Sequence, residues 1–159
     1  MKKNITNKIL MVRPVSFAFN EQTAVNNHYQ KLDNKPAQEI QNNALIEFDN
    51  MVEKLKKIGI DVKVMQDTKE PHTPDSIFPN NWFSTHYSNT VVLYPMFAEN
   101  RRLERTDSIY DYFDRVDNLN VIDYSSLEKE NIFLEGTGAL VLDRKNKKAY
   151  CSLSERANE

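Results

Sequence analysis

The feature of this sequence that most constrains its fold is an amphipathic segment at residues 36–58. Its apolar side chains recur in steps of three and four residues, which is the spacing of one face of an α-helix. Pro36 suits the first helical turn, and Gly59 suits the position just past the helix end. The pattern therefore predicts one long helix that buries a single face. The apolar side chains are Ala37, Ile40, Ala44, Leu45, Phe48, Met51, Val52, Leu55 and Ile58.

The segments on both sides of this helix are typical of strands. Residues 9–12 form a short apolar run, and residues 60–65 alternate between apolar and polar side chains. The helix-and-strand unit returns after roughly sixty residues, which indicates a repeated α/β architecture. Further strands are predicted at 77–85, 90–94, 120–124, 139–142 and 149–153, with a hairpin turn at 87–89, a helix at 100–116 and a long loop at 15–35.

The composition argues against several classes of protein. Lys and Arg number 21 against 23 Asp and Glu, a net charge of −2, so no nucleic-acid partner is expected. No apolar run approaches the ~18 residues that a membrane span requires. The N-terminus is too polar for a signal-peptide core. We therefore expect a cytoplasmic protein with no membrane contact.

Cys151 is the only cysteine, so the chain has no intrachain disulfide and no cysteine-based zinc site. His28, His72 and His86 are scattered without metal-ligand spacing, and we expect neither a metal nor a cofactor. Cys151 lies in a β-prone run, which predicts a buried small side chain and not a reactive thiol.

One polar segment, residues 74–82, carries Asp75, the adjacent amides Asn80 and Asn81, and the only Trp of the chain. In a regular strand neighbouring side chains point to opposite faces, so the two amides would not meet one ligand. The alternative to a binding segment is a turn rich in Pro and Asx residues.

Two further segments could carry a site. Residues 135–138 read Glu-Gly-Thr-Gly and hold two of the three glycines, which would let a ligand approach the backbone closely. The alternative is a hairpin or bulge. Arg156, near the end of the chain, could bind a carboxylate in a two-pronged contact or be an ordinary solvated arginine. The pair Arg101 and Arg102 is open to the same two interpretations.

Taken together, four segments in this order resemble the guanidine-modifying (pentein) superfamily. They are Pro-Asp-Ser-Ile-Phe-Pro-Asn-Asn-Trp-Phe-Ser-Thr-His at 74–86, Asn-Arg-Arg-Leu-Glu-Arg at 100–105, Leu-Glu-Gly-Thr-Gly at 134–138 and Leu-Ser-Glu-Arg at 153–156. Arginine deiminases, dimethylarginine hydrolases and glycine amidinotransferases belong to this superfamily. The chain most resembles the amidinotransferase-like branch that includes bacterial citrulline-utilisation hydrolases.

The resemblance implies the fold and the chemistry. The fold would be a partial α/β-propeller, with about half of the five ββαβ-type units, and residues 1–159 would be the N-terminal portion of a single pentein domain without an internal boundary. The reaction would be hydrolysis of a linear amidine or ureido C–N bond in an arginine- or citrulline-like amino acid. A Cys nucleophile and a His acid/base would perform it by covalent catalysis.

The resemblance also assigns substrate-binding roles. Asp75, Asn80 and Asn81 lie where the family places substrate-binding acids. The latter two positions are acidic in dimethylarginine hydrolases, whereas in this chain they are amides. Because amides both donate and accept, they tolerate a neutral ureido group, so we expect a citrulline-like substrate. Glu135 resembles the acid that grips the substrate nitrogens. Arg102 and Arg156 resemble the arginines that bind the α-carboxylate.

The family's catalytic His and Cys follow the segment that ends at Arg156, and Cys151 does not match the nucleophile. We therefore expect these 159 residues to be the front half of a propeller, inactive alone and able to self-associate through the open half. The alternatives are a non-catalytic amino-acid-binding module and an inactive truncated remnant.

Overall fold

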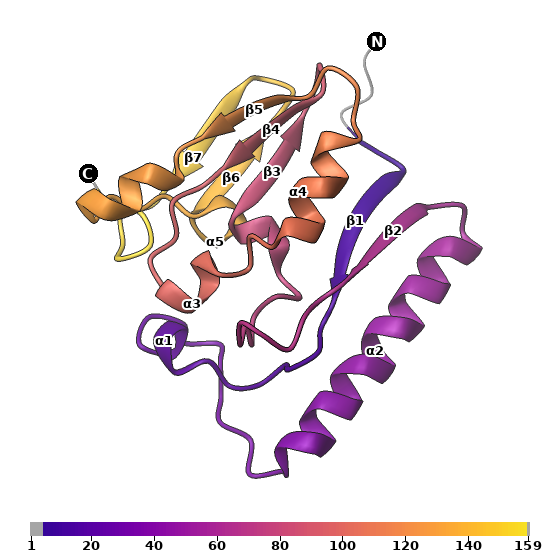
Figure 1. The fold of residues 1–159 in the computed structure, drawn as a ribbon. Coiled ribbons are helices and arrows are strands. Elements are labelled where there is room, and N and C mark those ends of the chain that lie inside the picture. Colours follow the sequence, from indigo (N-terminus) through magenta and orange to yellow (C-terminus); the bar gives the residue numbers. More distant parts are fainter. Residues whose placement is uncertain (1–4, 159) are drawn as a thin grey trace. The chain divides into compact units, whose positions relative to one another are not determined.

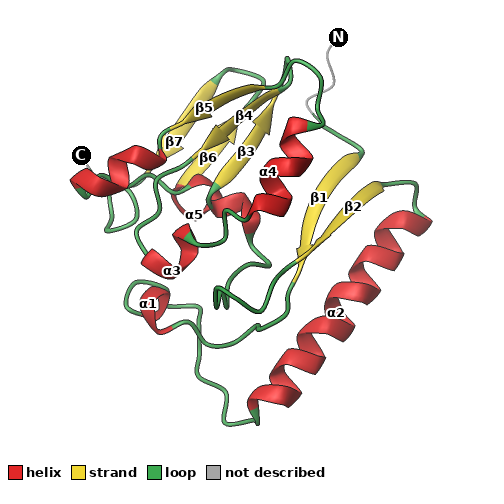
Figure 2. Ribbon diagram, in the orientation of Figure 1, coloured by secondary structure: helices red, strands yellow, loops and turns green. Residues whose placement is uncertain are grey.

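The computed structural model describes residues 5–158 (Figure 1). Their contacts divide the chain into two compact units, one ending at Phe78 and one beginning at Pro79. Each unit mixes helices with small sheets (Figure 2), which confirms the α/β class. The propeller arrangement and the single undivided domain stay predictions.

The first unit is a strand–helix–strand unit, as the sequence predicts. Strands β1 (Lys8–Arg13) and β2 (Asp61–Gln66) pair in parallel, and helix α2 (Ala37–Lys57) connects them. A small core forms where Phe48 and Val52 of α2 meet Val62 of β2. The apolar stripe of α2 is therefore the surface that holds this unit together.

The end of α2 shows why Gly59 stands where it does. Gly59 has a φ of +87°, which a residue with a Cβ rarely adopts. Its N–H donates to Lys56 O at 3.0 Å, and Ile60 N–H donates to Leu55 O at 3.1 Å. These are the two bonds of a Schellman motif, and they satisfy carbonyls that the helix end would otherwise leave unpaired.

The expected loop at 15–35 contains a short helix that the sequence interpretation missed, α1 (Glu21–Ala24). Asn20 caps it, since its side-chain oxygen accepts a hydrogen bond from Gln22 N at 3.1 Å. The remainder of the segment is irregular, as expected.

The second unit is built on a sheet with the strand order β3 (Phe83–His86), β4 (Thr90–Leu93), β5 (Asn120–Asp123). The first pair is an antiparallel hairpin whose turn residues Ser88 and Asn89 have positive φ angles of 61° and 49°. The second pair is parallel. The remaining elements are the 3₁₀ helices η1 (Pro79–Asn81) and η2 (Ser125–Glu130), the helices α3 (Glu99–Arg102), α4 (Asp107–Asp114) and α5 (Gly136–Ala139), and the hairpin strands β6 (Leu140–Asp143) and β7 (Lys148–Cys151).

Three local predictions in this unit were wrong. The strand expected from residue 77 begins only at Phe83, because Pro79, which has no N–H, starts the 3₁₀ turn η1. The helix expected at 100–116 is two helices, since Thr106 adopts extended backbone angles between them. Cys151, expected to be buried, is exposed on a strand whose residues all face solvent.

Within residues 5–158, no helix is long and apolar enough to cross a membrane. The same part of the chain contains no group of three His, Cys, Asp or Glu side chains arranged to hold a metal ion.

Candidate substrate-binding site

Glu135 is the centre of a polar network in the second unit. Its side chain is 1% exposed, immediately before α5. Oε2 accepts a hydrogen bond from Arg156 Nε at 2.7 Å and another from Arg156 Nη2. Oε1 accepts a long hydrogen bond from Phe97 N at 3.4 Å. Arg156 is thus a partner of a buried carboxylate, and the interpretation as an ordinary solvated arginine was wrong.

Asn81 joins this ion pair to a second one. With its amide oxygen turned toward the two arginines, it accepts from Arg101 Nη1 at 2.8 Å and from Arg156 Nη2 at 3.0 Å. Arg101 in turn makes a two-pronged contact with Glu104, at 2.7 and 2.9 Å. Because two donors fill both lone pairs of its oxygen, Asn81 can meet a ligand only as a donor through Nδ2.

The two glycines next to Glu135 allow this network to close. A Cβ on Gly136 would lie 2.6 Å from Asn80 O, and a Cβ on Gly138 would lie 2.6 Å from Glu135 Oε2 and overlap Arg156 Nη2. The segment is the helical turn α5, so the alternative interpretation as a hairpin or bulge was wrong. At Gly138 the backbone does approach other groups closely, as the glycines suggested, and these groups are the side chains of Glu135 and Arg156.

The structure brings together three of the predicted binding residues: Asn81, Glu135 and Arg156. Asn80 contributes its carbonyl at Gly136, and its side chain is exposed. Arg102 donates from Nε to Met96 O and from Nη2 to Phe97 O, both at 2.9 Å. Within residues 5–158, no hydrogen bond joins Arg102 to Asn81, Glu135 or Arg156.

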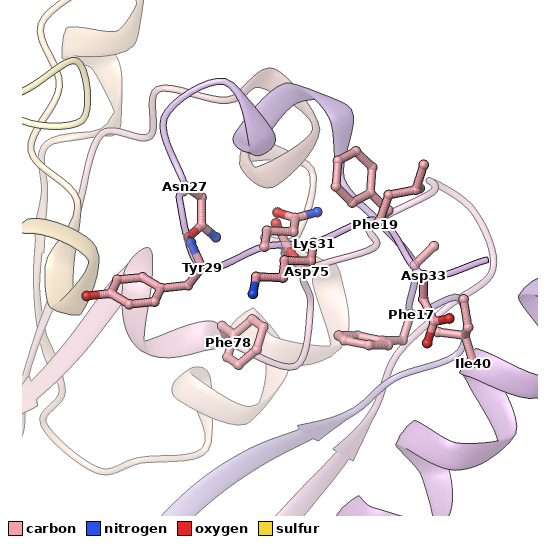
Figure 3. A pocket seen from close by; sticks show the side chains of 12 residues that line it. Phe17, Phe19, Asn27, Tyr29, Lys31, Asp33, Ile40, Asp75 and Phe78 are labelled. Atoms are coloured by element: carbon pink, nitrogen blue, oxygen red, sulfur yellow. The ribbon is translucent and has the colours of Figure 1, made fainter. Parts of the chain in front are cut away.

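Asp75 belongs to the first unit. Its buried carboxylate accepts hydrogen bonds from Asn20 Nδ2 at 2.7 Å and from Thr23 Oγ1 at 3.1 Å. It lines a cavity of about 460 Å³ whose walls include several aromatic rings (Figure 3). A buried acid beneath apolar walls suits a ligand that has both a polar group and an aliphatic chain. The rings include those of Phe17, Phe19 and Phe78.

His86, the last residue of β3, shares a chain of hydrogen bonds. Its Nε2 lies 2.7 Å from Ser84 Oγ, which lies 2.7 Å from Tyr94 Oη. Burial lowers the pKa of His86 below its usual value of 6.5, and the positive charge of Arg144 lowers it further. His86 is therefore favoured as a neutral hydrogen-bonding group at neutral pH.

Sequence reasoning missed Asn20 and underrated Arg101. Asn20 was in a segment assigned only as loop, and its position before an acidic first turn was the signal of a cap. Arg101 and Glu104 are three residues apart on a predicted helix, which is the spacing of a side-chain pair. That spacing allows the two side chains to pair, but it does not show that Arg101 is the buried one of the two neighbouring arginines.

Comparisons with known proteins identify the family of this chain. The family model of eukaryotic N,N-dimethylarginine dimethylhydrolase matches residues 13–159. The chain therefore belongs to this family, which confirms the resemblance to the guanidine-modifying superfamily. Comparison with curated protein sequences finds no match.

Solved structures of related enzymes have the same fold. The substrate-bound N-terminal domain of ArgZ, an arginine dihydrolase from Cyanobacteria, has a TM-score of 0.65 at 18% identity, with 95% of this chain and 50% of that one covered. A dimethylarginine dimethylaminohydrolase adduct with S-methyl-L-thiocitrulline also gives 0.65 at 18% identity, with 97% and 53% covered. AgrE in complex with L-arginine gives 0.62 at 19% identity, with 91% and 19% covered. The chain spans 21% of the complete ArgZ chain and about half of the two shorter ones.

Proposed function

We propose that this chain carries the substrate-binding residues of a hydrolase that cleaves a linear amidine or ureido C–N bond in an arginine- or citrulline-like amino acid. The observation that supports this most is the network of Glu135, Arg156, Asn81 and Arg101. It combines a buried carboxylate, which can accept from substrate N–H groups, with guanidinium groups that suit a carboxylate. The fold would be part of an α/β-propeller.

The chemistry would use a Cys and a His that lie beyond residues 1–159. The thiolate would add to the central carbon of the amidine or ureido group and form an S–C bond. The C–N bond would then break as His gives a proton to the leaving nitrogen, and water, deprotonated by the same His, would release the thiolate. In this chain Glu135 would hold substrate nitrogens with Asn80 beside it in the second unit, and Asp75 would keep, in the first unit, the substrate-binding role that the resemblance implies.

We assign the α-carboxylate to the arginines. Arg156 is partly exposed while it pairs with Glu135, so its guanidinium can reach both a ligand and the buried acid. Arg102 uses Nε and Nη2 on backbone carbonyls, which leaves Nη1 for a carboxylate oxygen.

A neutral ureido substrate fits better than a cationic guanidinium. Two arginines fill the Asn81 oxygen, so its Nδ2 N–H groups need an acceptor on the ligand. A ureido oxygen is an acceptor, whereas a guanidinium offers only donors. Citrulline is therefore the proposed substrate, and arginine is the alternative.

Calorimetry with citrulline and arginine tests this assignment on the 159-residue chain. We expect citrulline to bind more tightly, and Asn81→Asp to shift preference toward arginine by about tenfold, because a carboxylate attracts the guanidinium charge. Asn118→Asp, which adds the same charge at an exposed turn, is the matched control. Tighter arginine binding by the unaltered chain would refute the neutral-substrate assignment.

A turnover assay for ornithine and ammonia, together with the calorimetry, separates a chain that binds substrate from an inactive remnant and tests where the nucleophile lies. Binding without turnover is expected if the nucleophile lies elsewhere, and it would equally describe a non-catalytic binding module. Absence of binding would indicate an inactive remnant. Turnover that Cys151→Ser abolishes would contradict the proposal that the nucleophile lies beyond this chain.

A further inference from the structure

Charged side chains hold the backbone of residues 94–97, which follow β4. Arg105 Nη2 donates to Tyr94 O at 2.9 Å. Glu128 Oε1 accepts from Met96 N at 2.7 Å. Arg102 donates to Met96 O and Phe97 O at 2.9 Å each. The segment has no regular secondary structure of its own, so these bonds set its path.

Glu128 is the acid that organises these contacts. Its side chain, on η2, is 11% exposed. Oε2 accepts from Arg105 Nη1 at 3.1 Å and lies 3.8 Å from Arg102 Nε, and Oε1 also accepts from Arg105 Nη2. One carboxylate therefore anchors both arginines and binds the Met96 amide directly. Hydrogen bonds to charged groups in such a partly buried place are stronger than neutral ones.

The other side of residues 94–97 lies against the segment that carries Glu135. Leu134 N donates to Pro95 O at 3.1 Å, and the rings of Phe97 and Phe133 meet edge to face with centroids 5.5 Å apart. Phe97 N donates to Glu135 Oε1. The Phe97 amide is thus the donor that contacts the oxygen of Glu135 opposite the one paired with Arg156.

We infer that Glu128 is a positioning residue for Glu135. By holding Arg102, Arg105 and the Met96 amide, it fixes the Phe97 N–H and so the orientation of the Glu135 carboxylate. The inference rests on the proposed function, in which Glu135 holds the substrate nitrogens. A carboxylate that rotates would lose the alignment that a two-pronged contact requires.

The test compares Glu128→Gln with Glu130→Gln. Glutamine at 128 keeps the length and one acceptor but removes the charge that anchors the arginines. Glu130 is exposed at the end of the same 3₁₀ helix, so its replacement removes the same charge from the surface. NMR of the folded chain follows the Phe97 amide and the Arg156 Nε–H, which report the two oxygens of Glu135. Calorimetry with citrulline measures binding in parallel.

In Glu128→Gln we expect both NMR signals to shift and the Phe97 amide to exchange faster with solvent, while Glu130→Gln matches the unaltered chain. Citrulline binding should weaken by about three- to tenfold, the net value of one lost hydrogen bond. If Glu128→Gln does not fold, Glu128→Asp, which keeps the charge and shortens the side chain, is measured in the same way.

Unchanged Phe97 and Arg156 signals in a folded Glu128 variant would overturn the inference, because a side chain that only stabilises the fold leaves the native contacts of Glu135 intact. If the unaltered chain binds neither citrulline nor arginine, the proposed function fails, and the NMR signals alone decide whether Glu128 positions Glu135.

Discussion

Arg156→Met tests whether the pair of Arg156 and Glu135 behaves as a buried ion pair. Glu135 is 1% exposed and the Arg156 side chain 17%. The substitution keeps an apolar stem but leaves the carboxylate with the long bond from Phe97 N, and it removes one donor to Asn81. Removal of one partner from a buried pair costs about 3–5 kcal/mol. Because Arg156 retains some exposure, we expect the free energy of unfolding to fall by about 3 kcal/mol, the lower end of that range.

The chain contains a matched control for this experiment. Arg13 donates to Asp49 from the same two nitrogens, Nε and Nη2, at 2.8 and 2.7 Å, although it reaches both oxygens of its acid, and the two side chains are 32% and 53% exposed. Solvent and salt screen an exposed pair, so Arg13→Met should cost no more than about 1 kcal/mol. Burial is therefore the main difference between the two substitutions.

Urea denaturation measures how much each substitution lowers the free energy of unfolding. Trp82 is the only Trp and is fully buried, so its fluorescence follows the unit that contains Arg156. Circular dichroism, to which the 21 residues of α2 contribute strongly, follows the unit that contains Arg13. Raising the salt concentration should reduce the cost of Arg13→Met and leave most of that of Arg156→Met. Equal costs below about 1 kcal/mol for both would refute the argument from burial.

Three further outcomes are expected. Gly136→Ala should destabilise the chain by about 1–3 kcal/mol in urea denaturation, because its Cβ would lie 2.6 Å from a backbone oxygen that cannot move away alone. Phe48→Ala should cost about 3–5 kcal/mol by the same measurement, since it empties the small core under α2; a smaller loss than Ile46→Ala, an exposed position on the same helix, would contradict that role. For His86 the folded-state pKa is lowered, so the unfolded state binds the proton first, and stability should be fully present above pH 6.5 and fall as the pH drops below it. His86→Gln should flatten that part of a stability–pH profile, and an unchanged slope would show that another group is responsible.

The sequence predicted the elements whose signals are local. The stripe of α2 and the glycine after it carry their own periodicity and cap, and the hairpin turn before β4 carries residues that tolerate positive φ. The turn at Pro79–Asn81 was read as strand, because the aromatic residues after it favour strands and outweighed the proline in the middle. Whether such a segment forms a strand depends on its pairing with distant parts of the chain, which local propensity does not reveal.

The site was predictable only residue by residue. Asn81, Glu135 and Arg156 were chosen from polarity, glycine spacing and family resemblance, and the structure places them in contact. The choice between Arg101 and Arg102 was not accessible, since adjacent residues on a helix differ in direction by about 100° and only the packing shows which one is buried. Cys151 was misjudged because a β-prone run does not reveal whether both faces of its strand are covered.

The contacts of Asn81 have an evolutionary consequence. An amide between two guanidinium groups has one stable orientation, so the direction in which it donates is determined by Arg101 and Arg156. A substitution at Arg101, which is 2% exposed, could release that orientation without placing any new atom against a ligand. In the proposed function, where Asn81 meets the substrate, selection for a different ligand can therefore act on buried residues behind the amide, and relatives with the same asparagine need not share the same preference.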